Sequence, residues 1–140
     1  MTRLLLAALA LALATPALAD GGNRVTLRQG GHGNGAGLYQ DGRGNGLDVT
    51  QRGHGNSTIA LQDGRRNGVV VGQSGRHNEV IASQDGACNI LGVSQWGSGN
   101  VADLDQSGTC NATAVIQGGH GGTVTTRQGG HGNVAVVVQN

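Results

Sequence analysis

Residues 23–40 read Asn-Arg-Val-Thr-Leu-Arg-Gln-Gly-Gly-His-Gly-Asn-Gly-Ala-Gly-Leu-Tyr-Gln, and the rest of the chain repeats their pattern. Every glutamine of the 140-residue sequence lies eleven residues after the one before it. A fixed period of this kind indicates a repeat architecture, in which each unit packs only against its neighbours. The glutamines are Gln29, Gln40, Gln51, Gln62, Gln73, Gln84, Gln95, Gln106, Gln117, Gln128 and Gln139.

Glycine and asparagine share this period. Each of the first ten glutamines is followed two residues later by glycine, which is expected to provide a positive φ or close backbone packing in a turn. Asparagine follows five residues after glutamine, except at Gly122. The glycines are Gly31, Gly42, Gly53, Gly64, Gly75, Gly86, Gly97, Gly108, Gly119 and Gly130. The asparagines, opened by Asn23, are Asn34, Asn45, Asn56, Asn67, Asn78, Asn89, Asn100, Asn111 and Asn133.

Each eleven-residue unit is predicted to form one strand and one turn. The seven residues from asparagine to the next glutamine alternate as strand residues do, and the four residues that follow are Gly-rich. Two units make a 22-residue rung, so the sequence predicts an all-β, two-sheet β-solenoid. The face that carries Asn and Gln is the predicted interior. Its larger residues are Val25, Leu27, Leu47, Val49, Val69, Val71, Leu91, Val93, Thr113, Val115, Ala135 and Val137, and its smaller ones are Ala36, Leu38, Thr58, Ala60, Val80, Ala82, Ala102, Leu104, Val124 and Thr126.

The inward carboxamides predict how the chain assembles. An inward Asn or Gln with an unpaired amide costs about 1–3 kcal/mol, but an in-register parallel stack places the same amide one rung above and one rung below. The end rungs, residues 23–40 and 122–139, lack that neighbour on one side. A second copy of the chain is the predicted cap, and fibre growth by self-assembly follows.

The ends and the charge of the chain indicate an exported protein. Residues 1–19 combine Arg3, a short apolar stretch and small residues at Ala17 and Ala19, which predicts a secretory signal peptide; residues 20–22 form a short segment and residues 23–140 the repeat domain. No later stretch is apolar over the roughly 18 residues that a membrane helix needs, so no membrane insertion is expected. After cleavage, eight Arg balance eight acidic residues, which favours self-association and gives no reason to expect a nucleic-acid partner.

Two clusters of ionisable residues fall in the predicted turns. Asp41, Asp63 and Asp85 share one column, and His32, His54 and His120 share the opposite one; both sets are interpreted as solvated turn residues rather than metal ligands. No cofactor is expected. No catalytic constellation can be assembled from residues that point outward on turns, so the protein is predicted not to be an enzyme.

Two cysteines lie one rung apart. Cys88 and Cys110 occupy the same turn position, which places their Cα atoms near about 4.8 Å, within the range of a disulfide. Export to an oxidising compartment permits the bond. A disulfide and two free thiols both remain open from the sequence.

The pattern S/N-x5-Q-x-G-x-G-N-x-A-x3-Q, present almost position for position in residues 23–40, resembles the curlin repeat, and the resemblance extends over residues 23–139. It implies a secreted subunit of curli, the functional amyloid fibres of bacterial cell surfaces and biofilm matrix, with a role in adhesion. The implied partners are further copies of the chain, a second curlin subunit, and the curli export pore with its chaperones.

Two departures and one rival accompany the resemblance. Curlin subunits usually carry about twenty non-repeat residues after the signal peptide, where this chain has Asp20, Gly21 and Gly22, and Asn rather than Ser at strand starts resembles the minor, nucleating subunit. Major and nucleating roles both stay open. The rival is a monomeric secreted solenoid that binds ice or polysaccharide. A flat ice-binding face needs a regular Thr array, which the outward positions Thr26, Thr50, Val70, Gly92 and Ala114 do not form.

Overall fold

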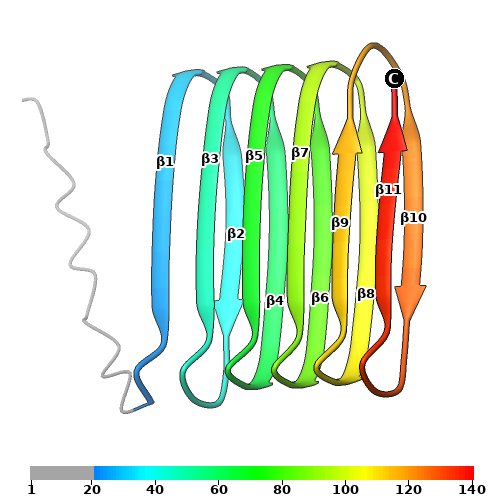
Figure 1. The fold of residues 1–140 in the computed structure, drawn as a ribbon. Helices are drawn as coiled ribbons and strands as arrows, with labels where there is room; N and C mark the ends of the chain where they lie inside the picture. The colour runs from blue at the N-terminus through cyan, green and yellow to red at the C-terminus, as the bar shows by residue number, and fades with distance from the viewer. Residues whose placement is uncertain (1–20) are drawn as a thin grey trace, which may run out of the picture.

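The structure, a computed structural model, describes residues 21–140; the predicted signal peptide and Asp20 lie outside the described residues. The described chain forms eleven strands that coil into two facing parallel sheets (Figure 1). Six strands form one sheet in the order β1-β3-β5-β7-β9-β11, and five form the other in the order β10-β8-β6-β4-β2. The strands are β1 (Arg24–His32), β2 (Gly35–Gln40), β3 (Gly46–His54), β4 (Ser57–Arg65), β5 (Gly68–Arg76), β6 (Glu79–Ala87), β7 (Ile90–Ser98), β8 (Val101–Thr109), β9 (Ala112–Gln117), β10 (Thr123–Gln128) and β11 (Val134–Gln139).

The strands stack in register with an offset of 22 residues. In the six-stranded sheet, Gln51 pairs with Gln73, and in the five-stranded sheet Gln62 pairs with Gln84. The glutamines therefore lie above one another from rung to rung. This confirms the predicted all-β solenoid of 22-residue rungs.

The core is a thin layer between the two sheets. Leu47, Val49 and Leu91 of the six-stranded sheet are buried against smaller residues of the five-stranded sheet such as Ala60 and Ala82. Alternating large and small side chains across the layer lets the two sheets interdigitate. Inward side chains are less buried at the ends of the stack, where Val25 and Leu27 of β1 are 51 % and 44 % exposed.

The strands are longer than the sequence predicted. Seven of them run for nine residues and continue three residues past glutamine, so that Arg52 pairs with Ser74 and Gly53 with Gly75. The predicted four-residue turns are therefore wrong after these seven strands, whereas β2, β9 and β10 end at glutamine as predicted. Turns that stack in register align their own backbone groups, and these groups extend the parallel pairing from rung to rung.

The turns hold two left-handed positions in each unit. The glycine two residues after glutamine has a φ such as 125° at Gly75, where an added Cβ would overlap the carbonyl oxygen of Gly97. Both reasons predicted for this glycine thus apply together. A second left-handed position, just before asparagine, was not predicted, because four units fill it with other residues. These are Arg66, His77, Cys88 and Cys110.

The outward positions form mixed columns. Thr26 stacks with Asp48, Val70, Gly92 and Ala114. The sequence-based choice of Thr50 for this column was wrong, because Thr50 pairs with Arg28 and Gly72. The corrected column still holds no regular Thr array. Among the described residues, no helix is long and apolar enough to cross a membrane.

Candidate functional site

Two columns of glutamine run through the interior, one at the end of each sheet's core. In the six-stranded sheet, Gln51 Nε2 donates to Gln73 Oε1 at 2.8 Å, and Gln73 Nε2 donates to Gln95 Oε1 at 2.9 Å. The five-stranded sheet repeats the arrangement, with Gln62 Nε2 donating to Gln84 Oε1 at 2.9 Å. Every such bond points from the N-terminal rung to the C-terminal rung, so each ladder has a direction.

The glutamines also tie the two sheets together. Gln73 Nε2 makes a second bond, 3.0 Å long, to the carbonyl oxygen of Ser57 at the start of β4 in the opposite sheet. Thr58 donates its hydroxyl to Gln73 Oε1 at 2.9 Å. One buried carboxamide thus contacts its own sheet above and below and the facing sheet beside it.

The asparagines hold the turns together and also form part of the predicted amide ladder. The backbone N–H of Asn67 donates to Asn45 Oδ1 at 3.0 Å, while Asn67 Nδ2 donates to the carbonyl of Asp63 in its own turn and to the carbonyl of Gly86 one rung on. In four units the side-chain amides also join directly: Asn56 donates to Asn34, Asn78 to Asn56, Asn100 to Asn78 and Asn111 to Asn89, at 3.1–3.3 Å. Asparagine therefore clamps each turn and links it to both neighbouring turns.

Gly122 interrupts one asparagine column. Its backbone N–H still donates to Asn100 Oδ1 at 3.0 Å, but it has no side-chain oxygen to offer the next rung. Gln139 Oε1 lies 2.8 Å from where a Cβ of Gly122 would stand, so the neighbouring carboxamide occupies the space. Elsewhere the polar interior is complete: within residues 21–140, no buried side-chain nitrogen or oxygen lacks a hydrogen-bond partner.

The two ends of the stack present complementary groups. We call β1 and β2 the N-edge, and β10 and β11 the C-edge; within the described residues each of these strands pairs on one side only. At the N-edge, Gln29 and Gln40 donate to the next rung but their Oε1 atoms accept nothing from residues 21–140. At the C-edge, Gln128 and Gln139 accept through Oε1, and their Nε2 atoms donate to nothing in the same range.

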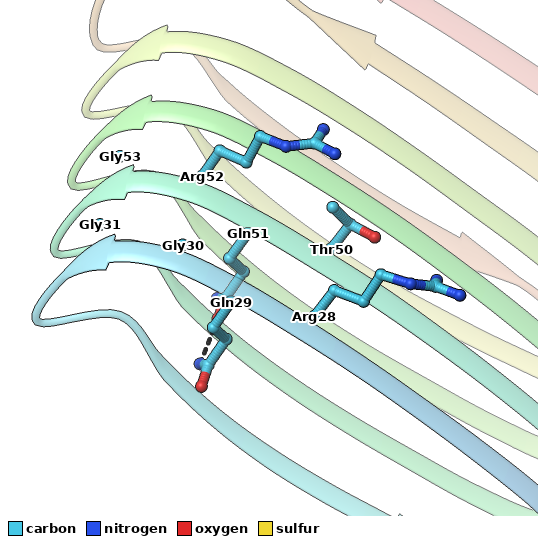
Figure 2. A pocket seen from close by; sticks show the side chains of 8 residues that line it. All are labelled: Arg28, Gln29, Gly30, Gly31, Thr50, Gln51, Arg52 and Gly53. Carbon is cyan, nitrogen blue, oxygen red and sulfur yellow. Dashed lines mark hydrogen bonds between the residues drawn. The ribbon is translucent and has the colours of Figure 1, made fainter.

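The side chains at the N-edge point to two opposite sides of the strands. Figure 2 shows Gln29 and Gln51 joined by a hydrogen bond on one side of the strands, while Arg28, Thr50 and Arg52 point to the other side. The shallow hollow that these residues line holds no carboxylate or imidazole. Its polar chemistry therefore consists of guanidinium groups outside and carboxamides inside.

Charge is distributed unevenly along the stack. Residues 21–76 hold seven Arg and three Asp, whereas residues 77–140 hold Arg127 as their one arginine against one Glu and three Asp. The formal side-chain charge is thus positive in the N-terminal half and negative in the C-terminal half. An arrangement of copies with N-terminal half against C-terminal half brings opposite charges closer than any other arrangement does.

The turn residues considered as ligands lie in the predicted columns. Asp63 pairs with Asp85, and His32 pairs with His54. The rings of His54 and His77 also come together, edge to face, with centroids 5.7 Å apart; the sequence did not group His77 with the others, because it occupies the left-handed position of its unit. Among the described residues, no three His, Cys, Asp or Glu side chains are placed to hold a metal ion.

Cys88 and Cys110 form a disulfide between adjacent rungs, with Cα atoms 4.4 Å apart. Both cysteines occupy left-handed positions, with φ near 63° and 54°. The bond joins the turns that precede β7 and β9, so it links neighbouring rungs of the six-stranded sheet on their turn side.

Comparison with known families agrees with this geometry. Residues 22–53 and 53–86 match the model of the curlin-associated repeat. The chain belongs to the curlin-repeat family. Beyond the matched residues, β7 to β11 keep the same spacing and register, so the curlin-type repeat continues structurally to Gln139. No curated protein matches the chain. The family and the fold together indicate a structural protein with the role of a curli subunit.

Proposed function

We propose that the protein is a secreted subunit that polymerises into curli-like amyloid fibres on the bacterial surface, where the fibres serve adhesion and the biofilm matrix. The observation that carries the proposal is the complementarity of the two edges. The N-edge offers carboxamide oxygens and the C-edge offers carboxamide N–H groups, so a copy docked head to tail completes both glutamine ladders. Two like edges brought together would leave both sets of groups unpaired.

The edge strands support the same proposal. β10 and β11 lack the Pro, the Lys and the bulges that blunt exposed sheet edges, and β11 exposes Val134, Val136 and Val138 on its outer face. The uneven charge along the stack adds an attraction between unlike ends, which speeds encounter at low salt. The copies, the export pore with its chaperones and a second curlin subunit are the proposed partners.

The test is seeded elongation of the mature chain. We expect purified chain to form fibres that bind thioflavin T and give the 4.7–4.8 Å cross-β reflection. Removing the C-edge donors with Gln128→Ala and Gln139→Ala is expected to slow elongation about tenfold. The control is Thr125→Ala, which lies in the same strand as Gln128 but is uncharged, points outward and leaves the ladder intact.

Two results would contradict the proposal. One is a mature chain that stays monomeric at all concentrations in analytical ultracentrifugation, which would favour the binding-module alternative. The other is an elongation rate of the double alanine variant equal to that of Thr125→Ala.

A further inference from the structure

The two sheets of the solenoid differ by one strand. Along the coil β11 follows β10, so the next strand position on the path lies against β10, in the five-stranded sheet. The chain itself begins with β1 in the six-stranded sheet. A second copy that continues the coil must therefore enter it on the other sheet (Figure 1).

Resting on the proposed function, we infer that an incoming copy docks its β1 on β10 and its β2 on β11. Successive copies are then related by a half-turn about the fibre axis, and the six-stranded sheet of one copy continues into the five-stranded sheet of the next. We call this contact the half-turn seam. The alternative, with β1 on β11, keeps each sheet on its own side and is called the straight seam.

Backbone pairing favours the half-turn seam. It gives both strands of the C-edge a new parallel partner. In the straight seam, β2 of the incoming copy lies two strand spacings, or about 9.6 Å, from β10. The backbone N–H and C=O groups on that side of β10 then face an empty strand position at the interior of the fibre, which sheets do not tolerate.

The glutamine ladders continue through the half-turn seam without a change of direction. Gln128 Nε2 faces Oε1 of Gln29 in the incoming copy, and Gln139 Nε2 faces Oε1 of Gln40 in that copy. All four groups lack these partners within residues 21–140. The straight seam joins Gln139 to Gln29 and leaves Gln128 and Gln40 without a partner.

At the first of the two inward core positions, the sizes of the side chains at the C-edge match the half-turn seam. At the first inward position after asparagine, the six-stranded sheet carries Val or Leu from β1 to β7 but ends in Thr113 and Ala135. The five-stranded sheet carries Ala102 at this position in β8 and Val124 in β10. At this position the half-turn seam stacks Val25 on Val124 and Ala36 on Ala135, whereas the straight seam stacks Val25 on Ala135; at the second inward position the straight seam, with Leu27 on Val137, matches size better.

Three positions work against the half-turn seam: it stacks Arg28 on Arg127 and Leu27 on Thr126, and it brings Asn23 to Gly122. Asn23 of the incoming copy stacks above Gly122, and its backbone N–H finds no asparagine oxygen there. Gln139 Oε1, beside the missing side chain of Gly122, is the nearest side-chain acceptor. The straight seam would place Asn23 on Asn133 and save this single bond, but it would lose a whole strand pair and one glutamine ladder.

Cysteine cross-linking separates the two seams. In a Cys88→Ser, Cys110→Ser background, Thr26→Cys with Thr125→Cys places the two thiols side by side across a half-turn seam, because Thr26 and Thr125 are equivalent outward positions in β1 and β10. Thr26→Cys with Val136→Cys does the same across a straight seam. Each single cysteine variant serves as a control. Fibres are grown reduced, oxidised mildly, dissolved and run on a non-reducing gel.

We expect a ladder of covalent multimers for the Thr26–Thr125 pair, at least tenfold above the single variants, and none for the Thr26–Val136 pair. A ladder for the Thr26–Val136 pair alone, for both pairs or for neither would overturn the half-turn seam while leaving fibre formation established. Failure of the wild-type chain to form fibres would overturn the proposed function, and the seam with it.

Discussion

The inner rungs and the end rungs are built from the same eleven-residue unit, yet only the inner rungs have the properties of a folded core. Val49 in β3 is fully buried, whereas Leu27, its paired residue in β1, is 44 % exposed. Gln73 takes part in four hydrogen bonds, and Gln139 in one. The difference lies in the number of neighbouring rungs, because the sequence pattern is the same.

This comparison teaches that the stability of each unit comes mainly from the units above and below it, as in other repeat proteins. An end unit contacts a neighbouring unit on one side, and its other side is available to a second copy of the chain. The same substitution should therefore cost much folding free energy in the middle of the stack and little at its ends. For end residues the cost should appear in assembly instead.

The largest difference is expected for a turn glycine. Gly75→Ala forces a left-handed φ on alanine and drives its Cβ into the carbonyl of Gly97, which should lower the free energy of unfolding by about 4 kcal/mol. Gly130→Ala meets only Asn133 Nδ2, at 3.5 Å, and should cost about 1 kcal/mol. Urea denaturation of freshly dissolved monomer measures both. Equal losses would show that neighbouring rungs do not set the cost.

A glutamine pair gives the next largest effect. Gln73→Ala removes four hydrogen bonds and leaves a gap beside Gln51 and Gln95, so we expect a loss of about 3 kcal/mol. Gln139→Ala should cost less than about 1 kcal/mol in the monomer and act on elongation instead. Denaturation and seeded growth are measured on the same preparations. A monomer destabilised equally by both variants would contradict the comparison.

The disulfide sharpens the comparison by adding a covalent link between two rungs. Cys88→Ser with Cys110→Ser should lower the free energy of unfolding by about 2–3 kcal/mol, because the 22-residue loop is no longer closed in the unfolded chain.

A matched variant separates the contribution of the disulfide to stability from that of the left-handed backbone. Replacing both cysteines by Gly also removes the bond but relieves two left-handed residues, and it should recover about 1 kcal/mol relative to the Ser variant. Equal stability of the oxidised and reduced wild-type chain would contradict a stabilising role.

The smallest effect is expected for the ion pair that joins β1 to β3. Arg28 Nη1 lies 3.3 Å from Asp48 Oδ1, but the two side chains are 62 % and 47 % exposed. Solvent screening limits such a pair, so Asp48→Asn should change the free energy of unfolding by less than about 0.5 kcal/mol. A larger loss that persists at 1 M salt would indicate that the N-edge is held by more than its ladders.

The sequence alone predicts the parts of this structure that repeat. The eleven-residue spacing identified the rungs, the inward face and the stacking of like residues, since one period links all of them. It did not predict that strands continue through Arg52 and Gly53, because stacked turns pair only in three dimensions. The second left-handed position was not predicted, because Arg66, His77 and the two cysteines occupy it in four units and these residue types do not indicate a positive φ. The amide partners predicted for asparagine are present in four units, such as Asn78 with Asn56, but the sequence did not predict that turn carbonyls accept from the same side chains.

The Cys88–Cys110 bond has a mechanical consequence. A force applied to the two ends of the chain can peel strands away one by one, but it cannot extend the segment between the cysteines while the bond holds. That segment, with a separation of 22 residues, corresponds to about 75 Å of contour length. Under tension the subunit would therefore extend in β1 to β6 and in β9 to β11, while the disulfide-closed loop that contains β7 and β8 would not extend.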